Sequence, residues 1–170
     1  MMLEIILDTD YYAEFIFQYY DQEKYNLGEG QFIEEGIISK GLANKINRVS
    51  ILYKEYEDPS VSGLVICSAL SIVELSRKYN EIMRGRLPVE KLYDFIQYPP
   101  GWFLIAPVDM DLTPFFVDVP PFVNVEGTLK PMEWTDSIHV ATLLSRGQIS
   151  QIATNDSKIK SIPTISSRTI

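Results

Sequence analysis

Four acidic residues stand where predicted strands end or predicted helices begin: Asp8, Glu74, Asp136 and Asp156. Carboxylates crowded into a partly dry cleft repel one another, and a hard, oxygen-seeking cation relieves that repulsion. Mg²⁺ or Mn²⁺ is the expected cofactor, because carboxylates and water are the ligands these ions prefer. An ion held in this way can activate water and neutralise the charge that develops on a phosphodiester.

A parallel sheet would bring these acids together. Buried strands are predicted at residues 3–7, 63–68, 102–109 and 151–156, with a further candidate at 162–167, and helices at residues 71–85 and 135–147. Strands that alternate with helices predict an α/β fold. Ligands of such sheets bind beyond the carboxyl ends of the strands, which is where the four acids are expected.

The length of 170 residues predicts a single domain spanning residues 1–170. Between the first strand and the second lies an extended segment, around residues 21–60, that is expected to be largely helical. Its glycines at positions 28, 30 and 36 predict a loop over residues 26–38. A helix is predicted from Ser39 onward, and the Asp58-Pro59 pair should end it.

The formal net charge of −8 disfavours sequence-blind binding of nucleic acid, because the phosphate backbone repels such a field. One cysteine, Cys67, rules out an intrachain disulfide framework and fits a reducing compartment. The N-terminus does not read as a signal peptide, and no apolar run is long enough to span a bilayer. A cytoplasmic protein without a membrane partner is expected.

Four stretches of the sequence resemble those of PIN-domain nucleases, in particular the VapC-type toxin ribonucleases: "ILDTD" (6–10), "ICSALSIVELSR" (66–77), "WTDSIHVATLLSRG" (134–147) and "IATNDSKIKSI" (152–162). They carry Asp, Glu, Asp and Asp in the order typical of that family. The last two stretches are the most specific. By topology the resemblance covers most of the chain.

This resemblance implies a PIN-like three-layer α/β/α sandwich with a mainly parallel central sheet. It also implies a metal-dependent endoribonuclease that cleaves single-stranded RNA, with Asp8, Glu74, Asp136 and Asp156 as the acid cluster. Asp8, Asp136 and Asp156 would hold the metal, and Glu74 would orient or deprotonate the attacking water. Family members usually form homodimers, and a small antitoxin protein holds the toxins inactive.

Other residues are expected to assist this site. Thr9 and Asp10 after the first strand, and Thr154 and Asn155 before Asp156, are predicted to orient the metal-holding acids by hydrogen bonds. Weaker candidates for RNA contact are the bases that flank the acids, Arg77, Lys78 and Lys158. His139, the only histidine, is expected to pack or to hydrogen-bond at a helix surface, with no catalytic role.

The sequence departs from the family pattern at three places. The stretch between Asp8 and Glu74 is longer than such toxins usually have, and residues 114–122 are rich in proline. Asp10 stands where the family normally has Ser, Thr or Asn.

Two alternative functions and several structural roles remain open. A strand followed by D-x-D also begins the haloacid-dehalogenase-type phosphatases, in which Asp8 would be the nucleophile. A non-catalytic PIN-like interaction protein is the other alternative. Asp8, Asp10 and Asp136 could simply cap helices. Glu74 could complete a capping box with Ser71.

Overall fold

The computed structural model describes residues 3–8, 55–56, 58–83, 93, 96–147 and 150–169; of Leu3 and residues 78–83 it describes the backbone alone. Most of the predicted segment around residues 21–60 lies outside these ranges, and so do Thr9 and Asp10. Glu55 and Tyr56 are helical and residues 58–60 form a turn, so the predicted end of the helix before Asp58-Pro59 is confirmed.

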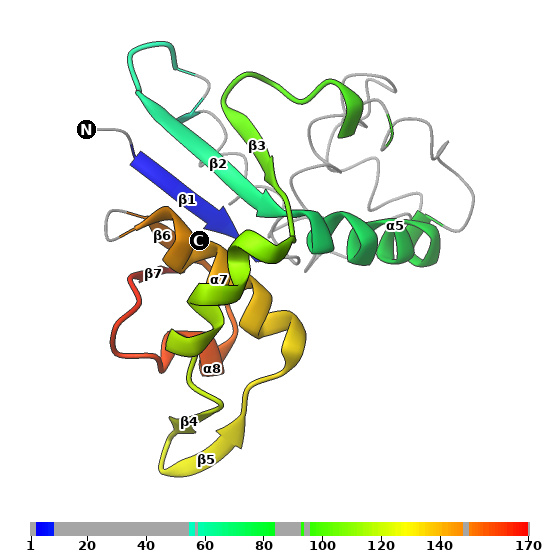
Figure 1. Ribbon diagram of the computed structural model, residues 1–170. Coiled ribbons are helices and arrows are strands. Elements are labelled where there is room, and N and C mark those ends of the chain that lie inside the picture. Colours follow the sequence, from blue (N-terminus) through cyan, green and yellow to red (C-terminus); the bar gives the residue numbers. More distant parts are fainter. Residues whose placement is uncertain are drawn as a thin grey trace, which may run out of the picture.

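A parallel sheet of five strands forms the centre of the molecule, in the order β3-β2-β1-β6-β7 (Figure 1). The strands are β1 (Leu3–Leu7), β2 (Gly63–Ser68), β3 (Phe103–Ala106), β6 (Gln151–Ala153) and β7 (Ser167–Arg168). Each neighbouring pair is parallel. Because β1 lies at the centre, its carboxyl end has β2 on one side and β6 on the other.

Both faces of the sheet are buried, which explains why the central strands contain almost only apolar residues. Ile6, Ile66 and Ile152 are neighbours on one face and are inaccessible to solvent. Ile5 and Val65 are neighbours on the opposite face and are equally buried. The predicted bounds of the first two strands are confirmed. The third and fourth strands are shorter than predicted.

Helix α7 (Trp134–Arg146) packs against the face that carries Ile6, with Val140 and Ala141 fully buried. It begins and ends one residue before the predicted helix, and Gly147 follows it with a φ of 92°, a conformation that glycine adopts without strain. Helix α5 (Ala69–Met83) follows β2 directly, two residues earlier than predicted.

The proline-rich connection forms two elements that the sequence did not predict. Residues Met110–Asp118 make a 3₁₀ helix, η2, which packs against α7, and Asp109 caps it by accepting a hydrogen bond from the Asp111 N–H at 3.0 Å. Strands β4 (Phe122–Val125) and β5 (Thr128–Pro131) then form an antiparallel hairpin that projects away from the sheet (Figure 1).

The prediction of a strand at residues 162–167 is wrong for all of these residues except Ser167. Ile165 N–H donates to the Ile162 carbonyl oxygen at 3.2 Å, so these residues turn instead of extending. Pro163 lacks the N–H that a paired strand needs. Pairing with β6 starts where Ile152 N–H donates to the Ser166 carbonyl oxygen, and β7 follows at Ser167.

Candidate functional site

The four predicted acids lie on elements that start or end at the same edge of the sheet. Asp8 directly follows β1, and Asp156 comes three residues after the end of β6. Asp136 is in the first turn of α7, and this helix runs back toward the start of β6, so its N-terminus lies at the carboxyl edge. Glu74 is on α5, which begins where β2 ends. The predicted location of the acids beyond the strand ends therefore agrees with the topology.

Thr154 connects Asp8 to Asp156. Its buried hydroxyl donates to Asp8 Oδ2 at 2.8 Å and accepts a hydrogen bond from the Asp156 N–H at 2.9 Å. The backbone reinforces this link, because Asp8 N–H donates to the Ala153 carbonyl oxygen at 3.0 Å. Thr154 thus lies between two of the predicted acids, and its role in supporting a metal site stays a prediction. Asn155 is exposed, and its role stays a prediction.

Lys158 connects Asp156 to Asp136. Its ammonium nitrogen lies 2.6 Å from Asp136 Oδ2, 3.0 Å from Glu133 Oε1 and 3.9 Å from Asp156 Oδ2. Burial by itself lowers the pKa of Lys158, but the hydrogen bonds to Asp136 and Glu133 and the charges of Asp136 and Asp156 outweigh it and raise that pKa above its ordinary value. Lys158 is therefore a firmly held cation among three carboxylates.

Asp156 also caps the short helix α8 (Ser157–Lys160), because its Oδ1 accepts a hydrogen bond from the Lys158 N–H at 2.7 Å. Asp136 does not cap α7. The residue before the first turn is Glu133, which makes no side-chain capping bond, and Asp136 lies inside the helix. The sequence interpretation of Asp136 as an N-cap is wrong for this reason.

Glu74 lies near a buried histidine. His139 Nε2 is 4.0 Å from Glu74 Oε2, and His139 Nδ1 is 3.4 Å from the hydroxyl of Ser68 at the end of β2. His139 packs and hydrogen-bonds, as expected, but it does so in the interior, with 2% of its surface exposed, and not at a helix surface. His139 lies three residues after Asp136, beside positions of α7 that are buried. This position was the signal in the sequence that His139 would lie in the interior near the acids.

The capping box predicted for Ser71 and Glu74 is not formed. Helix α5 begins at Ala69, so both residues lie inside it. Ser68 caps this end of the helix instead, because its hydroxyl accepts a hydrogen bond from the backbone N–H of Ser71 at 3.3 Å. Glu74 is thus available for a role other than capping.

The donor chemistry of the site suits a hard divalent ion, since carboxylate oxygens predominate. Within the described ranges, however, no group of three or more Asp, Glu, His or Cys side chains is close enough to hold one ion. The cation that lies between Asp136 and Asp156 is the ammonium of Lys158. A metal shared by these two acids would have to displace it.

The bases predicted to contact RNA are placed only in part. Arg77 is exposed on α5, and the side chain of Lys78 lies outside the described part of the structure. Lys158 could reach a phosphate only by leaving its carboxylates. RNA contact by these residues stays a prediction.

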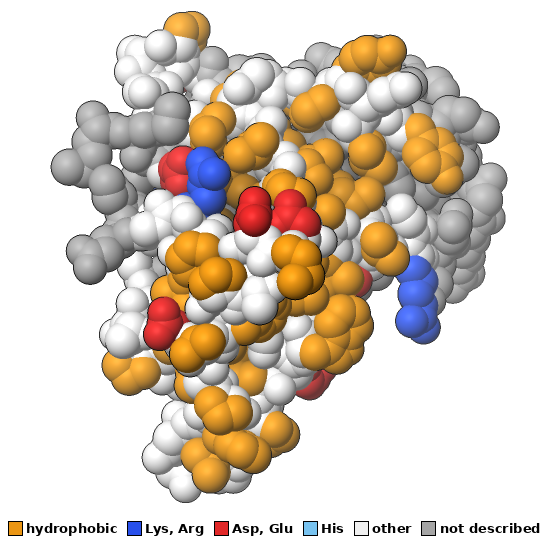
Figure 2. All heavy atoms as spheres, in the orientation of Figure 1, with side chains coloured by type: hydrophobic (Ala, Val, Ile, Leu, Met, Phe, Trp, Pro, Cys, Tyr) orange, Lys and Arg blue, Asp and Glu red, His pale blue; other side chains and the backbone are white. Residues whose placement is uncertain are grey.

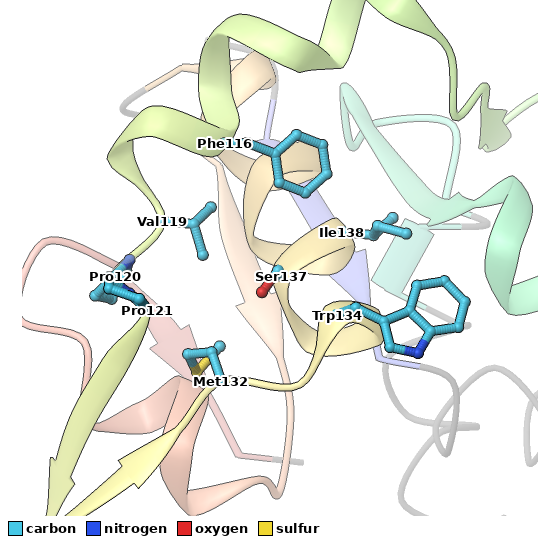
Figure 3. Close-up of a pocket in the computed structure, with 8 residues that line it drawn as sticks. All are labelled: Phe116, Val119, Pro120, Pro121, Met132, Trp134, Ser137 and Ile138. Atoms are coloured by element: carbon cyan, nitrogen blue, oxygen red, sulfur yellow. The ribbon is translucent and has the colours of Figure 1, made fainter.

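A groove of about 520 Å³ lies between η2, the hairpin and the start of α7 (Figure 3). It is lined by Phe116, Val119, Pro120, Pro121, Met132, Trp134, Ser137 and Ile138. Trp134, two residues before Asp136, is 68% exposed. Hydrophobic side chains are also prominent on the face that carries η2 and the hairpin (Figure 2). The groove therefore gives the start of α7 an open apolar surface, and none of the four acids lines it.

Comparison with known proteins gives one similarity of fold. No protein-family model matches the sequence, and no curated protein matches it either. Among solved structures, a chain of VapBC2 from Rickettsia felis is similar, with a TM-score of 0.56. That structure contains VapBC2 bound to a DNA fragment from the VapBC2 promoter. The sequences are 13% identical, and the similarity covers 98% of each chain.

The chain therefore has an α/β fold with a mainly parallel sheet, as predicted, and shares that fold with a VapBC2 chain. At 13% identity the similarity shows the fold alone. Among the described helices, none is long and apolar enough to cross a membrane.

Proposed function

We propose that this protein is a Mg²⁺- or Mn²⁺-dependent endoribonuclease that cleaves single-stranded RNA by attack of water. The observation that carries the proposal is the continuous line of contacts from Asp8 through Thr154 and Asp156 to Lys158 and Asp136. It joins three acids that are far apart in the sequence. They lie beyond the carboxyl ends of β1 and β6, at the edge where α/β sheets bind ligands.

The four acids have two roles in this proposal. Asp8, Asp136 and Asp156 would hold the metal, and the bound ion would lower the pKa of its water and neutralise charge on the phosphodiester. Glu74 would orient or deprotonate the attacking water. The nearby imidazole of His139 gives the Glu74 carboxylate a fixed neighbour on α7.

An exposed aromatic ring at the start of α7 suits an unpaired strand. Bases that are not stacked in a duplex bind well on exposed aromatic rings, and this stacking depends little on sequence. Trp134 offers such a ring on the first turn of α7, on the same turn as Asp136. This supports single-stranded RNA as the substrate class.

We further propose that the protein is the toxin of a toxin–antitoxin pair and forms a homodimer. The similar solved structure is a VapBC2 complex, which supports a small antitoxin as partner. Co-expression with the protein encoded by a neighbouring reading frame, followed by size-exclusion chromatography with light scattering, tests both assemblies.

The decisive experiment compares wild type with Asp8→Asn, which keeps the shape of the side chain and removes one charge. With Mn²⁺ present, wild type should cleave a single-stranded RNA, and Asp8→Asn should be slower by about 10²- to 10³-fold, equivalent to the loss of roughly 3 to 4 kcal/mol of transition-state stabilisation. Mn²⁺ at ten times its dissociation constant should stabilise wild type by about 1.4 kcal/mol. Its melting temperature should then rise by roughly 3 to 6 °C.

Asp10→Asn is the matched control. Asp10 is predicted from the sequence to cap a helix, a position that tolerates asparagine, so cleavage should change little. In the alternative phosphatase, both aspartates are needed and the substrate is a phosphate monoester. Equal inactivation of the two variants, together with turnover of an aryl phosphate, would therefore replace the nuclease proposal with that alternative.

A further inference from the structure

The ammonium of Lys158 lies where a bound cation would contact the acids. Its nitrogen is 2.6 Å from Asp136 Oδ2 and 3.9 Å from Asp156 Oδ2, so one positive charge serves carboxylates from α7 and from the end of β6. The Lys158 side chain is 14% exposed, and those of Asp136 and Asp156 are 17% and 28% exposed. The contact is thus largely shielded from water.

The backbone of this lysine is fixed, and its charged end is held only by contacts with carboxylates. Its backbone N–H is bound by Asp156 Oδ1 at 2.7 Å, and its neighbour Ile159 is fully buried. The Lys158 side chain, in contrast, is a flexible four-carbon stem with a compact charge at its end. The ammonium can therefore leave the carboxylates without moving α8.

A divalent ion and this ammonium cannot use the same carboxylate oxygens together. Magnesium and manganese need direct contact with oxygen, and a positive charge already lying on Asp136 Oδ2 would repel them. Without any cation, Asp136, Asp156 and Glu133 would repel one another. Lys158 relieves that repulsion when no metal is present.

We propose that Lys158 is a built-in competitor for the divalent cation, occupying the acid site until the metal displaces it. The lysine keeps the metal-free protein stable and lowers its affinity for the ion. This inference rests on the proposed function, because it concerns the same metal.

The test is calorimetric titration with Mn²⁺ of the full-length chain and of two variants. Lys158→Gln removes the competing charge. Lys160→Gln removes a charge of the same sign from an exposed position of the same short helix. Lys158→Gln should bind Mn²⁺ about tenfold more tightly than wild type, the change expected when one charge-assisted hydrogen bond no longer has to be broken. Lys160→Gln should stay within about twofold of wild type, because its charge is screened by solvent.

Melting curves and salt provide independent readouts. Without metal, Lys158→Gln should melt below wild type, and Mn²⁺ should raise its melting temperature by more than it raises that of wild type. The tighter binding should persist in 0.5 M KCl, roughly three to four times physiological ionic strength, because salt screens long-range fields far more than direct contacts.

A second measurement uses the wild-type protein, in case Lys158→Gln does not fold. The ¹⁵N NMR signal of the Lys158 ammonium, identified by its loss in Lys158→Arg, should be visible without metal and should shift or vanish as Mg²⁺ is added. An ammonium signal unchanged at saturating Mg²⁺ would overturn the competition.

The remaining outcomes separate this inference from the proposed function. If wild type binds Mn²⁺ and Lys158→Gln binds it equally or more weakly, the competition is wrong and the metal site stands. If Lys160→Gln also binds Mn²⁺ about tenfold more tightly than wild type, the competition is wrong as well. The electrostatic field of nearby positive charges would then explain both changes in affinity. If neither wild type nor Lys158→Gln binds Mn²⁺, the metal proposal itself fails, and the competition fails with it.

Discussion

The side chain of Thr154 links the end of β6 to the end of β1 by hydrogen bonds. Its hydroxyl both donates to Asp8 and accepts from the Asp156 backbone, so one buried side chain sets the spacing between two of the proposed ligands. Groups that hold metal ligands in place commonly matter nearly as much as the ligands themselves.

Thr154→Val should weaken the site without removing any acid. The variant leaves Asp156 N–H and Asp8 Oδ2 without the shared hydroxyl, which should cost about 1 to 3 kcal/mol of folding stability. Affinity for Mn²⁺ or the cleavage rate should fall by about 10- to 100-fold. Thr154→Ser keeps the hydroxyl and should retain most of both. Calorimetric titration and single-turnover cleavage measure these effects, and a Val variant as active as the Ser variant would contradict the role given to Thr154.

At the scale of elements, one ion pair joins the amino edge of the sheet to α7. Arg146, the last residue of that helix, donates to both carboxylate oxygens of Glu4 on β1, at 2.7 and 3.0 Å. The hydroxyl of Ser150, just before β6, donates to the same carboxylate at 3.1 Å. A helix and two strands thus meet at one side chain, opposite the candidate site.

Glu4→Gln should destabilise the protein in a pH-dependent way. The hydrogen bond from Arg146 is the main cause that lowers the pKa of Glu4 in the folded state from its ordinary 4.5. A lowered folded pKa means that this stabilisation is complete above the unfolded value and disappears as the pH falls through the folded value. At pH 7 the loss should be about 1 kcal/mol, since the pair is bidentate but partly exposed.

Urea unfolding of wild type and Glu4→Gln between pH 3 and 7 tests this expectation. The two stability curves should be separated near neutrality and should converge progressively as the pH falls below about 4.5. Glu126→Gln, at the exposed turn of the hairpin, is the control and should follow wild type throughout. A constant separation at every pH would show that the carboxylate charge is not the cause.

For the molecule as a whole, stability should depend most on the layer between the sheet and α7. Ile6 lies on the central strand, is inaccessible to solvent, and belongs to the same cluster as Ile66, Val140 and Ile152. Close-packed interiors cannot fully collapse around a missing side chain.

Ile6→Ala should therefore lower the free energy of unfolding by about 2 to 5 kcal/mol, and the melting temperature by roughly 5 to 15 °C. Val73→Ala on α5 removes two methyl groups from a side chain that is 67% exposed, and should change stability by less than about 0.5 kcal/mol. Differential scanning calorimetry distinguishes the two. Similar losses in both variants would mean that this layer is not the dominant core.

Local sequence alone predicted the central strands and the main helix. Residues 3–7 and 63–68 were predicted with their observed bounds, because a strand buried on both faces admits little except apolar side chains. The sequence did not predict the hairpin, whose pattern is visible in the structure. Positions 122–125 alternate between exposed and buried, and Glu126 and Gly127 both have positive φ, as a two-residue hairpin turn requires. Phe122 is apolar although it is 54% exposed, so the residue types alone do not show this alternation.

The set of acids and the edge of the sheet on which they lie could be predicted from the sequence, because each acid follows a local signal for the end of a strand or the start of a helix. Which side chains touch depends on the folded arrangement of distant elements. Lys158 pairs with Asp136, and His139 is buried near Glu74, because the strand order and the rotation of α7 bring these groups together. Local periodicity shows which face of an element is apolar. It does not specify which charged group from a distant element meets that face, since such contacts depend on the packing of the whole sheet.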